Sequence, residues 1–134
     1  MQHDCSDRNL KRGAGGTVDV EFITQMLQLK HAEQDRSVLV QGTRDAIARF
    51  KSLGILDAAT ADSLTEGYQL LRSVEARLRL MNTTARHDMP EDQEQLAKLA
   101  YLLNYEDAEG MSEAVAKQLT AIREVFNRIL PATQ

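Results

Sequence analysis

The sequence feature that most constrains the fold is the spacing of the apolar residues, which return every three or four positions along most of the chain. Near the end, five of them follow at spacings of four, three, four and three: Val115, Leu119, Ile122, Phe126 and Ile129. Residues at these spacings share one face of an α-helix, whereas a half-buried β-strand alternates with a period of two. The 134 residues include only two prolines and seven glycines, which is few for a β-sandwich or a loop-rich protein. We therefore expect an all-α fold, a single helical bundle of about five helices with one long central helix.

The expected helices cover most of the chain after the first ten residues. The first runs through the stretch Lys11–Leu29, and the third is the longest. The other boundaries follow from capping residues and from Pro90 and Pro131. We expect the later helices at Thr43–Leu53, Ala58–Thr84, Glu91–Leu103 and Ser112–Leu130.

Short polar residues and glycines are typical of helix ends, and several occupy such positions here. Gly54 is placed to end the second helix in the left-handed conformation, which glycine adopts without steric cost. Asp57 is placed to cap the third helix and Ser112 the fifth. Gly67 lies inside the third helix, where glycine is less favourable than alanine by about 1 kcal/mol. We expect it to mark a close crossing of two helices.

The composition limits the classes of protein to which the chain can belong. Its length suits one domain, and we expect a linker or tail over residues 1–10 and the bundle over 11–134. A net charge of −4 argues against a general nucleic-acid-binding protein. No segment is apolar enough for a signal peptide or a membrane span. Cys5 is the only cysteine, so an internal disulfide and a cysteine-pair zinc site are excluded. We expect a cytoplasmic protein without a metal site.

The stretch Lys11–Leu29 joins a basic pair and a glycine-rich turn to an amphipathic helix. Gly13, Gly15 and Gly16 allow positive φ angles and the close approach of another group. Thr17 is placed to cap the helix through its side-chain oxygen. The expected buried stripe consists of Val18, Phe22, Met26 and Leu29, widened by Ile23 and Leu27.

Two carboxylates, Asp19 and Glu21, lie in the first turn of this helix. Residues two apart on a helix point about 200° apart, so the two carboxylates cannot share one site. They could simply complement the positive helix N-terminus, at about 0.3–1 kcal/mol each. Alternatively, Lys11, Arg12, the glycine amides and the helix N-terminus could form an anion or phosphate cradle, with Asp19 orienting a neighbour. The order of the residues excludes a Walker A loop and a dinucleotide fingerprint.

Arg72, Arg79 and Arg86 recur at heptad spacing and therefore line one side of the third helix. Glu75 lies between the first two. Such a row can be a solvated helix face with weak ion pairs of about 0.3–0.5 kcal/mol. It can also be a basic surface that faces a partner.

The opening stretch closely resembles a motif of the glutamine synthetase adenylyltransferases, Lys-Arg-Gly-x-Gly-Gly-x-x-Asp-Ile-Glu-Phe-x-x-Gln. Residues 11–25 read Lys-Arg-Gly-Ala-Gly-Gly-Thr-Val-Asp-Val-Glu-Phe-Ile-Thr-Gln. The resemblance continues through residues 53–56, 67–78 and 96–100. The related PII uridylyltransferases carry a similar helical domain.

This resemblance implies a place in a larger enzyme. In that family a nucleotidyltransferase domain comes immediately before a helical bundle, and the pair occurs twice in one chain. The sequence of residues 18–21 is more similar to that of the second copy. The domain next to this second copy uses ATP and magnesium to add AMP to glutamine synthetase. The implied partners are the preceding nucleotidyltransferase domain, glutamine synthetase and the PII signalling protein.

The resemblance also implies that this chain is inactive alone. Nucleotidyl transfer of this type needs a Gly-Ser pair and an Asp-x-Asp pair to hold divalent metals, and the sequence contains neither. We expect no catalytic residue here. The residues expected to border the neighbouring active site or bind an anion are Lys11, Arg12, Gly13, Gly15, Gly16, Asp19 and Glu21. The alternative is a regulatory module in which Arg72, Arg79 and Arg86 meet PII protein, glutamine synthetase or glutamine.

Overall fold

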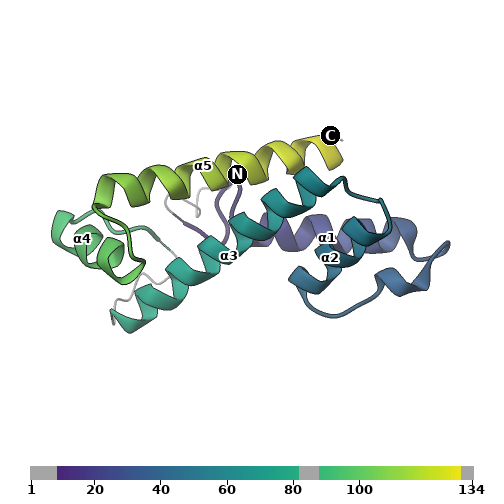
Figure 1. Ribbon diagram of the computed structural model, residues 1–134, viewed down its shortest axis with the longest axis horizontal. Coiled ribbons are helices and arrows are strands. Elements are labelled where there is room, and N and C mark those ends of the chain that lie inside the picture. Colours follow the sequence, from purple (N-terminus) through teal and green to yellow (C-terminus); the bar gives the residue numbers. More distant parts are fainter. Residues whose placement is uncertain (1–8, 82–87, 131–134) are drawn as a thin grey trace.

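The computed structural model describes residues 9–81 and 88–130, which form five α-helices and one short 3₁₀ helix (Figure 1). Within these ranges the only β-type pairing is an isolated bridge between Asn9 and Asp88. The predicted all-α bundle with a long central helix is confirmed. The elements are α1 Thr17–His31, η1 Arg36–Val38, α2 Thr43–Ser52, α3 Ala58–Leu80, α4 Gln93–Leu102 and α5 Ala108–Ile129.

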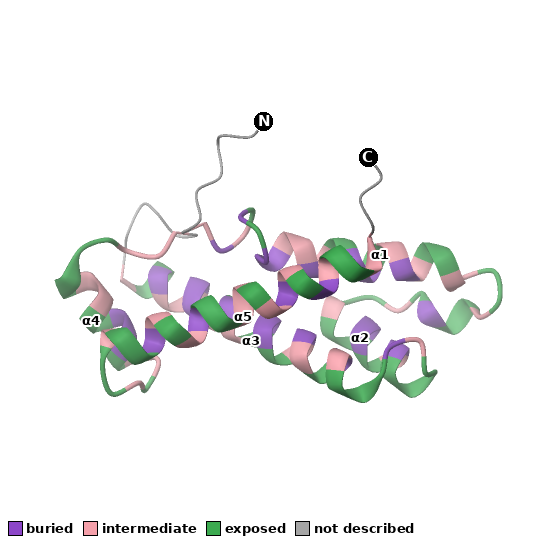
Figure 2. Ribbon diagram, turned by 90° about the horizontal axis from the view of Figure 1, so that it is seen from above, coloured by how far each residue is buried: buried purple, intermediate pink, exposed green. Residues whose placement is uncertain are grey.

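The helices are arranged around the crossing of α3 and α5, which run along the length of the molecule (Figure 1). Helices α1 and α2 pack against one end of this pair, and α4 packs against the other end. Buried positions lie where the helices meet (Figure 2). The glycine-rich residues before α1 therefore reach the bundle between its two ends, beside α5.

The core is continuous and is supplied mainly by α3. Its buried apolar residues follow helical spacing, as the sequence predicts, and Leu64, Leu71 and Leu78 are fully buried. Phe50 of α2 and Ile122 of α5 are also fully buried against this core. Leu10 is fully buried as well, although it ends the segment that was expected to be a tail.

Gly67 marks the α3–α5 crossing, and this prediction is confirmed. A Cβ atom at Gly67 would lie 2.9 Å from Cδ1 of Ile122 and 3.0 Å from Oε1 of Gln118. Real Cβ atoms almost never approach another atom so closely, so the glycine lets the two helices come together.

Two predicted helix ends are confirmed. Gly54 has a φ of +76°, and the amides of Gly54 and Ile55 donate to the carbonyls of Lys51 and Phe50, which is a Schellman motif at the end of α2. The Asp57 carboxylate accepts from the amide of Thr60 at the start of α3.

Other predicted boundaries are wrong by a few residues. Gly16, without a side-chain acceptor, precedes α1, and Thr17 is its first residue. Helix α5 begins earlier than Ser112 because Asp107 caps the amide of Gly110. Asp92 likewise caps α4, which begins later than predicted. Helix α3 ends at Leu80, so it is shorter than predicted. Residues 82–84, the last part of the predicted helix, lie outside the described residues.

The predicted buried face of α1 is right at Ile23 and Leu27 but wrong at Phe22 and Leu29. Phe22 and Leu29 are 46% and 75% exposed, and the buried residues are Thr17, Val20, Ile23, Thr24 and Leu27. Apolar residues extend around much of this helix, so their spacing alone does not distinguish two adjacent faces. Packing against α2, α3 and α5 selects the face that carries Ile23 and Leu27.

Candidate functional site

The glycine-rich segment before α1 is a compact loop in which most amides donate hydrogen bonds within the chain. The Asn9 side-chain oxygen accepts from the amides of Lys11 and Arg12, at 3.0 and 2.8 Å. The carbonyls of Leu10 and Lys11 accept from the first two amides of α1, those of Thr17 and Val18. Helix N-termini leave their first amides without helical partners, and here the preceding loop supplies acceptors for two of them.

Gly15 allows this loop to touch α5. Its φ is +79°, and a Cβ atom there would lie 2.0 Å from the carbonyl oxygen of Leu119. Gly16 is equally confined, because its Cβ would lie 2.6 Å from the carbonyl oxygen of Leu10. The two glycines are therefore required by the close contact of backbone with backbone.

Asp19 ties the loop to α5 by a second contact. One of its carboxylate oxygens accepts both from the amide of Gly15, at 2.7 Å, and from the Arg123 guanidinium, at 2.8 Å. The Asp19 side chain is only 13% exposed. The Arg123 guanidinium also lies 4.3 Å from the ring centre of Phe126, a cation–π geometry. The carboxylate thus joins the loop, α1 and α5.

Glu21 points to a different helix, as its spacing from Asp19 predicts. Its carboxylate accepts a hydrogen bond of 2.9 Å from the hydroxyl of Tyr68 on α3. Burial is the main cause that raises the pKa of Tyr68, and Glu21 raises this pKa further. Thr43 and Arg72 act in the opposite direction. The Arg72 guanidinium lies 5.9 Å from the centre of the Tyr68 ring.

These contacts limit what the predicted anion cradle can use. The amides of Gly13, Gly15 and Gly16 all donate within the chain. An anion at this loop would therefore rest mainly on the side chains of Lys11, which is half-buried, and Arg12, which is exposed. The carboxylates of Asp19 and Glu21 are already used by Arg123 and Tyr68, and only Asp19 lies in the first turn of α1, where both were predicted.

The described ranges contain no group of three or more His, Cys, Asp or Glu side chains that could hold a metal ion. The residues around the loop therefore do not fit the magnesium site that nucleotidyl transfer requires. In the same ranges, no helix has the length and apolarity to cross a membrane.

The predicted arginine row lies partly on a second feature, a groove along α3. Arg72 and Arg79 are both exposed and line this groove, and Arg86 lies outside the described residues. Arg44 of α2 lines the same groove, and so does Arg77, whose Nε donates to the carbonyl of Leu102. The groove has a volume of about 650 Å³ and is lined by Arg44, Tyr68, Gln69, Arg72, Ser73, Ala76, Arg77 and Arg79.

Sequence reasoning missed three of the residues that build these two features. Arg123 pairs with Asp19 across 104 positions, and no local pattern indicates that contact. Arg44 reaches the groove from another helix, so the heptad spacing on α3 cannot find it. Tyr68 lies in the segment 67–78 that shares the resemblance, and this place is the one sequence signal that points to it.

Comparison with known proteins matches the sequence of this chain to one region of larger proteins. A family model described as GlnD PII-uridylyltransferase matches residues 2–130. A bifunctional glutamine synthetase adenylyltransferase/adenylyl-removing enzyme from Agrobacterium fabrum is 32% identical over 121 residues, which are 90% of this chain and 12% of the relative. The relative of the same name from Mycobacterium tuberculosis is 34% identical, over 94% of this chain and 14% of its own length. That from Cutibacterium acnes is 39% identical over 93 residues, 69% of this chain and 10% of its own. The chain spans only a small part of each of these relatives.

Proposed function

Because the chain belongs to the GlnD PII-uridylyltransferase family and matches the adenylyltransferases over nearly all of its length, we propose that it is a helical domain of a bifunctional glutamine synthetase adenylyltransferase. The resemblance predicted from residues 11–25 is confirmed at the level of the family. In this proposal the chain acts in the cytoplasm as part of a nitrogen-regulating enzyme.

The proposed role of the domain is to support AMP transfer from ATP to a tyrosine of glutamine synthetase. A preceding nucleotidyltransferase domain carries the magnesium ions and performs the chemistry. The observation that carries this role is the loop of residues 9–16, which is held against α5 by Gly15 and Asp19. A loop fixed at two points can present Lys11 and Arg12 to a neighbouring active site in one defined position. The sequence of residues 18–21 favours the half of the enzyme that adds AMP.

The test is the Asp19→Asn substitution in the complete enzyme. Asparagine keeps an acceptor for the Gly15 amide but loses the charge that pairs with Arg123, so the loop is held less firmly. We expect AMP transfer to fall by about tenfold or more, because small displacements at an active site have large effects on rate. The measurement is the rate of AMP incorporation into glutamine synthetase, together with thermal unfolding of the variant.

The matched control is Lys51→Gln, which breaks an ion pair between Lys51 and Asp62 in which both side chains are about half exposed. This pair joins α2 and α3 and does not touch the loop. We expect normal transfer from the control. An Asp19→Asn enzyme with full activity, or a control with the same loss, would contradict the proposed role of the loop.

A second role, recognition of a regulatory partner, is favoured by the exposure of Arg72 and Arg79 on one groove. In this proposal the groove side of α3 meets PII protein, glutamine synthetase or glutamine. Calorimetric titration of the chain with PII protein and with glutamine tests two of these partners directly. The absence of heat with both would remove them as ligands of this domain.

A further inference from the structure

The groove along α3 carries a charge that differs from that of the chain as a whole. Four of its eight lining residues are arginines, and none is aspartate or glutamate. The complete chain has a net charge of −4. Acidic side chains, although in excess overall, are thus absent from the lining of this groove. A concave surface with one sign of charge concentrates ligands of the opposite sign.

Three of these arginines have no carboxylate partner within the described residues. Arg44, Arg72 and Arg79 form no ion pair there. Arg72 lies over the Tyr68 ring, and Arg44 is close to the amide of Gln69, which can accept from it. Such contacts orient a guanidinium without neutralising its charge. Arg77 is different, because its Nε is already bonded to the Leu102 carbonyl.

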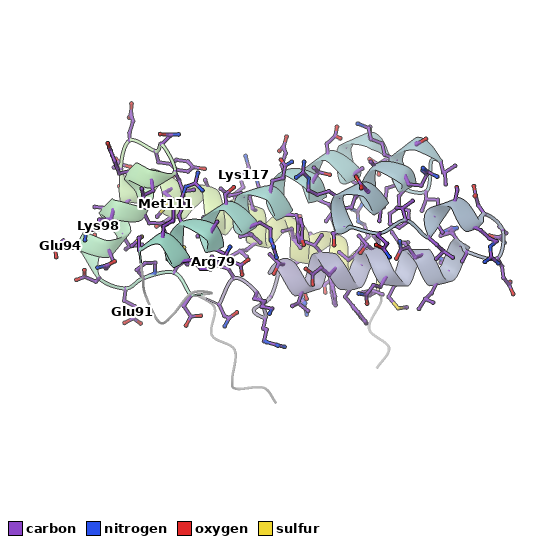
Figure 3. The ribbon with its side chains drawn as sticks, turned by 90° about the horizontal axis from the view of Figure 1, so that it is seen from below. Arg79, Glu91, Glu94, Lys98, Met111 and Lys117 are labelled. Carbon is purple, nitrogen blue, oxygen red and sulfur yellow. The ribbon has the colours of Figure 1, made fainter. Side chains whose placement is uncertain are left out.

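The spacing of the arginines suits an extended ligand. Arg72 and Arg79 are seven residues apart on α3, a separation of about 10 Å along the helix axis. Arg79 lies toward the end of α3 beside α4 (Figure 3). Arg44 of α2 lies close to Gln69, which precedes Arg72 on α3, so it approaches the groove on the other side of Arg72. An extended peptide advances about 3.3 Å per residue and alternates its side chains, so carboxylates on one face lie two or four positions apart, at about 7 or 13 Å. These two separations bracket the distance between the two arginines, which long side chains can adjust to. A single phosphate group could not reach both ends of this row.

We propose that the groove binds an extended acidic segment of a partner protein, with Arg44, Arg72 and Arg79 as its carboxylate-binding residues. Arginine suits this role because its planar guanidinium can donate two hydrogen bonds to one carboxylate. Arg77 is a positioning residue that joins α3 to the end of α4. The inference rests on the proposed second role of the domain, since it names the chemistry of the partner that the groove would recognise.

The experiment measures binding of a fluorescein-labelled oligoglutamate peptide to the 134-residue chain by fluorescence anisotropy at low ionic strength. We expect binding that weakens as salt is added, because exposed charge pairs are screened. The double variant Arg72→Gln and Arg79→Gln should weaken the affinity by about tenfold, the sum of two partly exposed ion pairs. Arg44→Gln should weaken it to a smaller extent.

The matched control is Arg36→Gln, which removes one positive charge from an exposed position in η1 outside the groove. The affinity of this control for the peptide should stay within about twofold of that of the unchanged chain. A change of this size is smaller than the largest effect of losing one exposed ion pair. Equal losses in the control and in Arg44→Gln would overturn the proposal, because the peptide would then respond only to net charge. No binding to the unchanged chain would also overturn it.

Inorganic pyrophosphate separates a peptide site from a phosphate site. We expect it to compete with the oligoglutamate only weakly. Strong competition that is lost in the double variant would identify a phosphate site and overturn the proposal. All of these measurements use the 134-residue chain alone, so a negative result would leave the Asp19→Asn test of the complete enzyme unaffected.

Discussion

At Gly15 the glycine loop and α5 meet, and both the backbone conformation and the available space exclude a side chain. Its φ of +79° is unfavourable for any residue with a Cβ atom. A Cβ would also lie only 2.0 Å from the Leu119 carbonyl oxygen, which belongs to a helix backbone and cannot rotate away. Gly54 has nearly the same φ, +76°, but nothing lies within 4 Å of the corresponding position.

The two glycines allow strain and clash to be measured separately. Gly54→Ala should lower the free energy of unfolding by about 1 kcal/mol, the cost of the left-handed conformation. Gly15→Ala should lower it by about 3 kcal/mol or more, because the loop must also move away from α5. Urea unfolding followed by circular dichroism gives both values. Similar losses in the two variants would show that the loop does not press against α5.

Tyr68 is a residue through which alkaline pH should act on this protein. Burial and Glu21 raise the pKa of its hydroxyl above the ordinary value of 10.0. A group whose pKa is higher in the folded than in the unfolded state contributes stability below the unfolded pKa and loses it as the pH rises through the folded pKa. We therefore expect the free energy of unfolding to fall above about pH 10.

Absorbance titration of the three tyrosines tests this assignment. Tyr101 is 80% exposed and serves as the reference within the chain. Tyr68→Phe should remove the tyrosine that ionises at the highest pH and should weaken the loss of stability in alkali. Glu21→Gln should lower the pKa of Tyr68, because it removes a nearby negative charge. If the high-pH end of the titration curve is unchanged in Tyr68→Phe, another tyrosine is the one that ionises at the highest pH.

At the scale of elements, the crossing of α3 and α5 holds the two ends of the bundle together. The nearest atom to a Cβ at Gly67 is Cδ1 of Ile122, the end of a side chain that can be shortened. Alanine is favoured over glycine inside a helix by about 1 kcal/mol. Gly67→Ala therefore combines a gain in helix propensity with a clash at the crossing.

A double-mutant cycle separates these two effects. Ile122→Val alone should lower the free energy of unfolding by about 1 kcal/mol, because it removes a buried methyl group. In the Gly67→Ala background the same change should cost about 1 kcal/mol less, since the lost atom is the one that the new Cβ meets. Thermal and urea unfolding of the four proteins give the coupling. A coupling energy of zero would mean that the helices separate to accept the new methyl group.

At the scale of the whole molecule, the glycine loop and the arginine groove are connected through α1. Asp19 lies in the first turn of this helix and Glu21 directly after it, and their side chains contact α5 and α3 respectively. The Tyr68 ring that meets Glu21 also lies under Arg72 in the groove. The two candidate surfaces thus share one network of contacts. Phe22, also on α1, stacks on the ring of Phe126 of α5 with 6.2 Å between the ring centres.

The sequence by itself determined the features that depend on near neighbours along the chain. The period of the apolar residues predicted the helices, and Gly54 and Asp57 predicted two helix ends, because capping is decided within a few residues. The motif of residues 11–25 indicated the family. The spacing of Asp19 and Glu21 was enough to predict that they serve different neighbours.

Only the tertiary structure decided the features that depend on contacts between distant segments. Packing chose the face of α1 that carries Ile23 and Leu27 over the equally apolar face with Phe22, because the choice depends on what α2, α3 and α5 can cover. It also brought Arg123 to Asp19 and Arg44 to the groove. The periodicity of a short segment does not predict such pairs, because burial and charge pairing depend on contacts across the whole fold.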